Sequence, residues 1–146
     1  MTLSDAFCVD RYRDEFLDLM RSGTVDIVFA NSREIKSLYQ TESFDEALEL
    51  IRRDCKIAAV TRSEKGSVIV RGDETVAIRA IPIAKLVDTT GAGDLYAAGF
   101  LYGYTAGLDL KRCGDLGSLA AGLVIQQVGP RPRENLRVEA QKIGLL

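Results

Sequence analysis

The sequence predicts an α/β fold in which helices pack on a mainly parallel sheet. Short apolar runs bounded by turn residues alternate with amphipathic segments of helical period, as expected for strands joined by crossover helices. No internal repeat, low-complexity tract or linker interrupts the alternation. The 146 residues correspond to one domain, and 47% apolar with 27% charged residues is an ordinary soluble composition. We therefore expect residues 1–146 to form a single lobe.

The first part of the chain is predicted to combine helices with two buried strands. One helical stripe of apolar residues is formed by Val9, Tyr12, Phe16 and Met20. The segment Ser43-Phe-Asp-Glu46 has the pattern of a capping box ahead of a second amphipathic helix. The expected elements are a helix at 5–21, a strand at 26–30, a helix at 31–40, a helix ending near 54 and a strand at 56–61.

The second part is predicted to begin with a β-hairpin and to continue into helices. Alternating residues at 67–70 and 75–79 flank Arg71-Gly-Asp-Glu74, which is typical of a hairpin turn. Gly107 and the pair Gly129-Pro130 are expected to end helices. The remaining expected elements are a sheet extension at 81–87, a turn at 88–93, helices at 94–106 and 116–128, and a last helix after 134.

Composition excludes several classes of function. The net charge of −2 and the lack of long apolar runs indicate neither nucleic-acid nor membrane binding. No basic and then apolar stretch follows Met1, and three widely spaced cysteines suit free thiols, so we expect a cytoplasmic protein. The chain has no histidine, so a general base must be Asp, Glu, Lys, Cys or Tyr.

The segment from Leu86 to Phe100 is the most informative for chemistry. Gly91 and Gly93 permit a sharp turn before a helix and keep side chains out of the approach path. The first amides of that helix would point outward and, with the helix dipole, form an anion site. Asp94 lies beside this site and could accept a proton from a hydroxyl group. Together these parts suit phosphoryl transfer to an alcohol.

The same residues also admit a purely structural interpretation. Thr89 or Thr90 could cap the helix, Asp94 could favour the helix dipole, and the glycines could only make a turn. Composition and spacing leave both interpretations open. A G-x-G-x-x-G dinucleotide pattern and a Walker-type P-loop are both absent.

The run Asp88-Thr-Thr-Gly-Ala-Gly-Asp94 resembles the motif of the ribokinase-like, phosphofructokinase-B-type carbohydrate kinases. The resemblance implies a three-layer α/β/α fold and ATP-dependent transfer of phosphate to a hydroxyl of a sugar or nucleoside. It implies that Asp94 is the catalytic base and that Gly91, Ala92 and Gly93 form the anion hole.

Two further segments match motifs of that family. Asn31-Ser-Arg-Glu34 matches Asn-x-x-Glu, a pair that helps to organise Mg²⁺ and phosphate, although Asn31 and Glu34 also fit a capping box. The loop after the strand at 56–61 resembles Thr-x-Gly-x-x-Gly, which approaches the nucleotide phosphates. Thr61 and Gly66 match this pattern, whereas Ser63 replaces the middle glycine.

The resemblance assigns weaker roles to three other places. The segments that contain Gly117 and Gly129 correspond to the adenine pocket, although small residues at Gly117 also suit helix packing. Many members bind a monovalent cation, and Asp88 and Thr90 are the matching positions.

The resemblance covers roughly residues 3–132, or about half of a usual member of the family. The opening segment resembles a helix of adenosine-kinase-like members. The absent half carries a lid and most substrate contacts, so we expect association with that half or with a second copy. A non-catalytic nucleotide-binding module, or an inactive fragment, stays the alternative.

Overall fold

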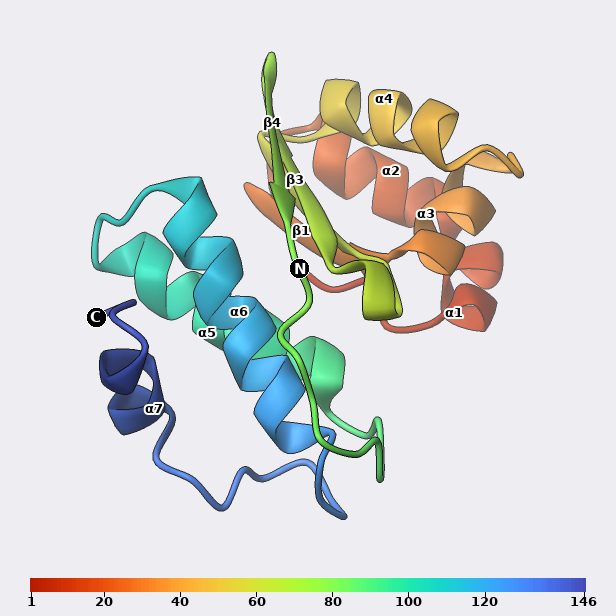
Figure 1. Cartoon of the computed structure of the whole chain (residues 1–146). Helices are drawn as coiled ribbons and strands as arrows, with labels where there is room; N and C mark the ends of the chain where they lie inside the picture. The colour runs from red at the N-terminus through yellow and green to blue at the C-terminus, as the bar shows by residue number, and fades with distance from the viewer. The chain divides into compact units, whose positions relative to one another are not determined.

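The computed structural model describes residues 1–146. Residues 1–62 and 68–76 form one compact unit, and residues 63–67 and 77–146 form a second. The elements in Figure 1 are α1 (Ala6–Arg11), α2 (Arg13–Arg21), β1 (Ile27–Asn31), α3 (Ser32–Tyr39), α4 (Phe44–Asp54), β2 (Ile57–Thr61), a 3-10 turn (Ser63–Lys65), β3 (Ser67–Arg71), β4 (Glu74–Ile78), α5 (Ala92–Thr105), α6 (Leu110–Val124) and α7 (Leu136–Lys142). No helix has both the length and the apolar character needed to span a membrane.

The four strands form one sheet in the order β1-β2-β3-β4. β1 and β2 are parallel, with Ile27 opposite Ile57 and Asn31 opposite Thr61. A connection of only two residues joins β3 to β4, which makes that pair a hairpin, because a parallel crossover needs a dozen or more residues. The predicted α/β class is therefore confirmed, and the sheet is mixed.

The first unit buries its core between the strands and four helices. Helices α1 to α4 lie on the same side of β1 and β2 (Figure 1). The core side chains are Leu3, Val9, Leu17, Met20, Val28, Ala30, Ile35, Leu38, Ala47, Leu48, Ile51, Ala58, Val60, Val68 and Val70. Apolar residues recur at helical spacing in the helices and run continuously through the strands, so burial of this face accounts for both patterns.

The structure corrects two details of the predicted helices in this unit. The helix expected at 5–21 is broken at Tyr12 into α1 and α2. Val9 and Met20 are buried on both sides of the break, so the apolar period does not reveal it. At α4, the Ser43 hydroxyl accepts the Glu46 amide at 3.2 Å, but the Glu46 carboxylate accepts the Thr41 hydroxyl instead of completing a box.

Helices α5 and α6 form the centre of the second unit and pack closely (Figure 1). A Cβ atom added at Gly99 would lie 2.5 Å from the Leu116 carbonyl oxygen, and one added at Gly117 would lie 2.8 Å from the Tyr96 carbonyl oxygen. Glycine is therefore required at both positions for the helices to approach each other. This packing accounts for Gly117, and a role for Gly117 in an adenine pocket stays a prediction.

The predicted strand at 81–87 is wrong. This segment has no strand pairing and runs along α6 as an extended strap. The Ser118 hydroxyl donates to the Arg79 carbonyl at 3.0 Å, and the Gln126 side chain accepts the Ala84 amide at 2.9 Å. Ser118 of α6 and Gln126, which follows α6, thus supply partners that a neighbouring strand would have supplied.

Helix boundaries in the second unit also differ from expectation. α5 begins at Ala92, two residues earlier than predicted. α6 runs from Leu110 to Val124 rather than 116–128, because Asp109 caps it by accepting the Arg112 amide at 2.8 Å. The predicted last helix is confirmed as α7, which packs against α6.

Candidate functional site

The glycine-rich turn leads into α5 without a side-chain cap. Gly91 is the residue before the helix, with a left-handed φ of 79°. A Cβ atom there would lie 2.6 Å from the Pro130 Cβ, so glycine is required by both conformation and space. The Ala92 amide donates to the Thr89 carbonyl at 3.1 Å, and the Leu95 amide donates to the Gly91 carbonyl at 2.9 Å.

The next two amides are left free by this arrangement. The backbone N–H groups of Gly93 and Asp94 form no hydrogen bond within the protein. Gly93 is exposed, and no atom lies within 4 Å of the position that a Cβ would occupy. Neither Thr89 nor Thr90 caps the helix, so the structural alternative of a threonine cap is wrong. Two unpaired amides at the positive end of a 14-residue helix are suited to binding an anion.

The Asp94 carboxylate stands beside these amides in the first turn of α5. Its side chain is exposed and forms no hydrogen bond or ion pair. No positive group of the chain neutralises it, so it is available to accept a proton or to pair with a ligand. The predicted residues Gly91 to Asp94 therefore all lie at the start of one helix, α5.

Asp88 fixes the shape of the turn that precedes α5. One carboxylate oxygen accepts the Thr90 hydroxyl at 2.6 Å and the Thr90 amide at 2.9 Å, and the other accepts the Gly129 amide at 2.9 Å. The hydrogen bond from the Thr90 hydroxyl, followed by that from the Gly129 amide, lowers the pKa of Asp88. Asp88 thus ties the turn at 88–90 to the turn at 129, and its predicted role at a monovalent cation stays a prediction.

The loop after β2 contains two residues with left-handed backbone. Ser63 has a φ of 53°, a conformation that costs a non-glycine residue energy. Gly66 has a φ of 83°, and a Cβ there would lie 1.9 Å from the Ile78 carbonyl oxygen. Ser63 therefore adopts the type of conformation that the family's glycine would favour. Thr61 ends β2 and donates weakly to the Ala30 carbonyl at 3.4 Å.

Asn31 and Glu34 form a complete capping box at the start of α3. The Asn31 side-chain oxygen accepts the Glu34 amide at 2.9 Å, and the Glu34 carboxylate accepts the Asn31 amide at 2.9 Å and its side-chain NH₂ at 2.6 Å. Glu34 is only 6% exposed. Burial raises the pKa of Glu34, although the hydrogen bond from the Asn31 amide acts in the opposite direction. The capping interpretation is confirmed.

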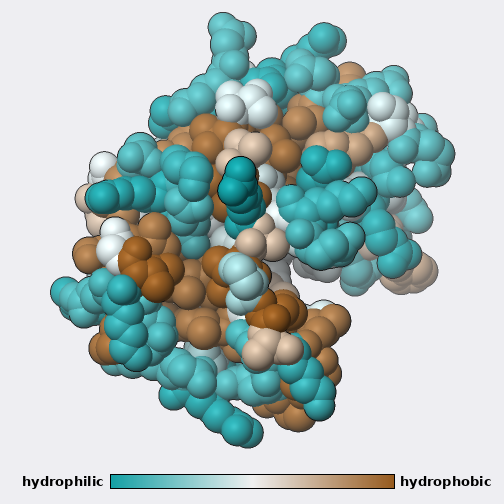
Figure 2. Space-filling view, in the orientation of Figure 1, coloured by the Kyte–Doolittle hydropathy of each residue, from teal (hydrophilic) through white to brown (hydrophobic).

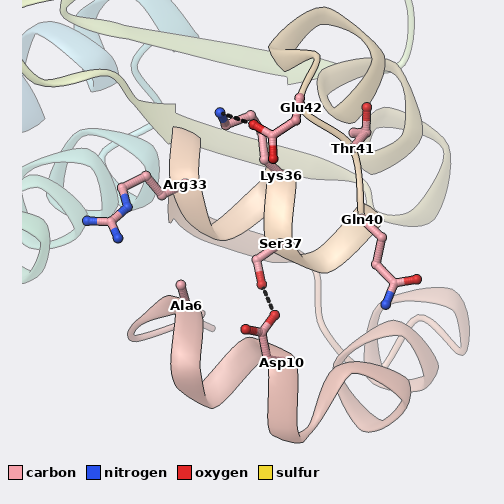
Figure 3. Close-up of a pocket in the computed structure, with 8 residues that line it drawn as sticks. All are labelled: Ala6, Asp10, Arg33, Lys36, Ser37, Gln40, Thr41 and Glu42. Carbon is pink, nitrogen blue, oxygen red and sulfur yellow. Dashed lines mark hydrogen bonds and ion pairs between the residues drawn. The ribbon is translucent and has the colours of Figure 1, made fainter.

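A polar cavity of about 520 Å³ lies between α1 and α3, and sequence reasoning missed it. Figure 3 shows Ser37 bonded to Asp10 across the cavity, and Lys36 paired with Glu42 at 3.3 Å, while Arg33 points away. The lining residues are Ala6, Asp10, Arg33, Lys36, Ser37, Gln40, Thr41 and Glu42. None of them is a predicted site residue. Lys36 and Glu42 form an ion pair, Asp10 accepts a hydrogen bond from the Ser37 hydroxyl, and Arg33 forms no ion pair. The residues that line this cavity come from two separate segments and follow no motif, so the sequence did not indicate the cavity.

No group of three or more His, Cys, Asp or Glu side chains is arranged to hold a metal ion. Glu34 lies in the first unit, and Asp88 and Asp94 lie in the second. A cation at any one of these carboxylates would need ligand or water oxygens to complete its coordination.

Comparison with known proteins places the chain in a family. Residues 2–135 match the model of the pfkB family of carbohydrate kinases. A probable sugar kinase from Rhizobium etli CFN 42 is 66% identical over the whole chain, with a TM-score of 0.99, and the chain covers 44% of that protein. An adenosine kinase from Sinorhizobium meliloti is 64% identical over 99% of the chain, with a TM-score of 0.97 and 44% of that protein covered.

A more distant structure has the same fold. Arabidopsis thaliana ribokinase, solved with ribose and ATP, is 27% identical over 88% of the chain, with a TM-score of 0.76 and 43% of that protein covered. The chain thus spans less than half the length of the relatives that it matches. The likeness confirms the ribokinase-like α/β fold. The chain belongs to the pfkB family of carbohydrate kinases.

Proposed function

We propose that this chain is the catalytic part of an ATP-dependent kinase that phosphorylates a hydroxyl of a sugar or nucleoside. The observation that carries the proposal is the start of α5, where two unpaired amides adjoin an exposed carboxylate. The relatives support the substrate class, because they are a probable sugar kinase, an adenosine kinase and a ribokinase solved with ribose and ATP.

The proposed chemistry assigns one role to each part of this helix start. Asp94 takes the proton of the acceptor hydroxyl while the hydroxyl oxygen attacks the terminal phosphorus of ATP. The bond from that phosphorus to the bridging oxygen breaks, and ADP leaves with the electron pair. The Gly93 and Asp94 amides, at the positive end of α5, stabilise the negative charge on the transferring group. Gly91 and Ala92 shape the turn that aims these amides.

Asn31 and Glu34 fit a supporting role toward Mg²⁺ that acts through water. Both oxygens of Glu34 already accept hydrogen bonds from Asn31, so direct coordination would require this box to open. Mg²⁺ keeps several waters in most protein sites, and a buried carboxylate can orient them. When bound, the ion would neutralise part of the phosphate charge. Thr61, Ser63 and Gly66 are proposed to lie along the nucleotide phosphates.

The alternative function is nucleotide binding without catalysis. It is favoured by the free Gly93 and Asp94 amides, which can bind a nucleotide phosphate whether or not an acceptor hydroxyl is bound. Titration of the chain with ATP and Mg²⁺, together with a product assay on a panel of sugars and nucleosides, separates the two functions. Binding without turnover supports the module, whereas turnover supports the kinase.

Asp94→Asn tests the proposed catalytic role. In a complete enzyme containing this chain, we expect turnover to fall by roughly 10²–10⁴-fold, because a positioned general base contributes about that much, while ATP affinity is nearly unchanged. Asp73→Asn, which makes the same change in the exposed β3–β4 turn, is the control. Near-normal turnover of Asp94→Asn contradicts the role of Asp94.

We also propose that the second unit associates with the family's other half or with a second copy. Apolar residues gather over α5 and α6 in Figure 2. The exposed large apolar residues of this unit are Ile83, Leu86, Val87, Leu101, Tyr102, Tyr104, Val128, Val138, Ile143 and Leu146. Such clusters typically mark interaction surfaces. Light scattering over a broad concentration range tests this, and a persistent monomer counts against self-association.

A further inference from the structure

A buried pair of hydroxyl groups connects α5 to the start of β3. Tyr96 lies two residues after Asp94 and is 3% exposed, and Ser67 is 2% exposed. Their hydroxyl oxygens are 2.7 Å apart, and either group can donate. Each is therefore the partner that the other needs in a site that water does not reach.

The Tyr96 ring is held in place by close packing. It lies against Gly117 of α6, where an added Cβ would come within 3.1 Å of a ring carbon. Burial raises the pKa of Tyr96 to about 12, with the hydrogen bond to Ser67 acting in the opposite direction. The phenol therefore stays protonated at neutral pH and keeps a hydrogen for the bond.

The pair joins the two segments that are proposed to contact phosphate. Ser67 directly follows Gly66, whose position is fixed by its close approach to the Ile78 carbonyl oxygen. Tyr96 follows the free amides of Gly93 and Asp94 by less than one helical turn. The loop of residues 63–67 and α5 belong to the same compact unit. A displacement of Ser67 would therefore be transmitted to the beginning of α5 through a single buried hydrogen bond, the one to Tyr96.

We propose that Ser67 and Tyr96 are positioning residues. Their hydrogen bond holds the loop of residues 63–67 at a fixed position relative to the free Gly93 and Asp94 amides of α5. Neither side chain reaches solvent, so neither touches a ligand. The inference rests on the proposed function, because the loop and the amides are taken to bind one nucleotide. It goes beyond the family likeness, since it depends on two hydroxyl groups of this chain.

The test is a double-mutant cycle with Ser67→Ala, Tyr96→Phe and the double variant in the full chain. Each single change removes one hydroxyl and keeps the remaining shape. We expect each to weaken binding of ATP with Mg²⁺ by roughly tenfold, the equilibrium equivalent of one unsatisfied buried hydroxyl. The double variant should bind no more weakly than a single variant, since one shared bond is lost. Tyr12→Phe, which removes an exposed hydroxyl that forms no hydrogen bond, should leave binding unchanged.

Amide hydrogen exchange gives a second readout that needs no ligand. Ser67→Ala should speed exchange at the Leu95 and Tyr96 amides of α5, although Ser67 lies on β3. The inference is overturned if the variants lower stability but leave both ATP affinity and this exchange unchanged, or if the two changes act additively. If the unmodified chain fails to bind ATP with Mg²⁺, the proposed function is contradicted separately. In that case faster exchange in α5 supports the positioning link, and unchanged exchange overturns it.

Discussion

Helices α3 and α5 begin in opposite ways. Asn31 caps α3, and its reciprocal capping box with Glu34 occupies the first amides of that helix. Gly91 precedes α5 without a side-chain cap, and the Gly93 and Asp94 amides remain free. A capping side chain stabilises a helix by about 1 kcal/mol, so α5 forgoes stabilisation that α3 has. The comparison shows that side chains satisfy the first amides of α3, whereas α5 keeps two amides available, as the proposed phosphate-binding role requires.

The largest effect is expected from Gly91→Ala, which damages the open helix start. The new Cβ would meet Pro130 at 2.6 Å in a left-handed conformation, so the turn must move. We expect unfolding free energy to fall by about 1–3 kcal/mol and ATP-dependent turnover to fall by roughly 100-fold, as for loss of an oxyanion-binding donor. Urea unfolding and steady-state assays measure the two effects.

Gly107→Ala is the matched control for this change. Gly107 follows the other end of α5 with a φ of 76°, but nothing lies within 4 Å of its Cβ position. It should show the cost of the backbone conformation alone and little loss of activity. Equal losses of turnover in the two variants would contradict a specific role for the turn at Gly91.

Asn31→Ala breaks the capped helix start and should mainly affect stability. It removes the acceptor of the Arg33 and Glu34 amides and the side-chain donor to the buried Glu34 carboxylate, and leaves only the bond from the backbone amide of residue 31. We expect a loss of about 1–3 kcal/mol in unfolding free energy, measured by urea unfolding. Ser43→Ala removes a cap that lacks the reciprocal carboxylate bond and should cost less. A larger loss for Ser43→Ala would contradict the comparison of the two caps.

The smallest effect is a pH dependence that originates at Glu34. Because burial raises the folded-state pKa of Glu34 above 4.5, the folded state holds this proton more tightly than the unfolded chain. Its contribution to unfolding free energy is therefore fully present below the unfolded pKa and is lost as pH rises through the folded pKa. Glu34→Gln should remove this component, as seen in unfolding free energies measured from pH 4 upward. An unchanged pH profile would show that Glu34 does not contribute it.

Local patterns predicted much of the fold and of the candidate site. Gly91 before α5 dictates a turn through its left-handed conformation, and the spacing of Asn31 and Glu34 allows their side chains to reach each other's amides and form a cap. Both depend on residues within four positions of each other, which is the range over which sequence spacing fixes geometry. The left-handed φ of Ser63 was harder to predict from the sequence, because serine rarely adopts this conformation.

Features set by distant contacts could not be predicted. The segment 81–87 has the apolar character of a strand, yet its Ala84 amide donates to the side chain of Gln126, which follows α6, and not to another strand. The bond between Ser67 and Tyr96 joins residues 29 positions apart and has no local pattern. Tertiary packing decides such contacts, so spacing along the chain does not reveal them.

The most direct test of the central claim follows the backbone amides of α5 by NMR while ATP and Mg²⁺ are added. We expect the amide signals of Gly93 and Asp94 to shift most, and the amide signals of the capped α3 start, Arg33 and Glu34, to shift less. Large changes elsewhere, with the Gly93 and Asp94 signals unmoved at saturation, would contradict the account.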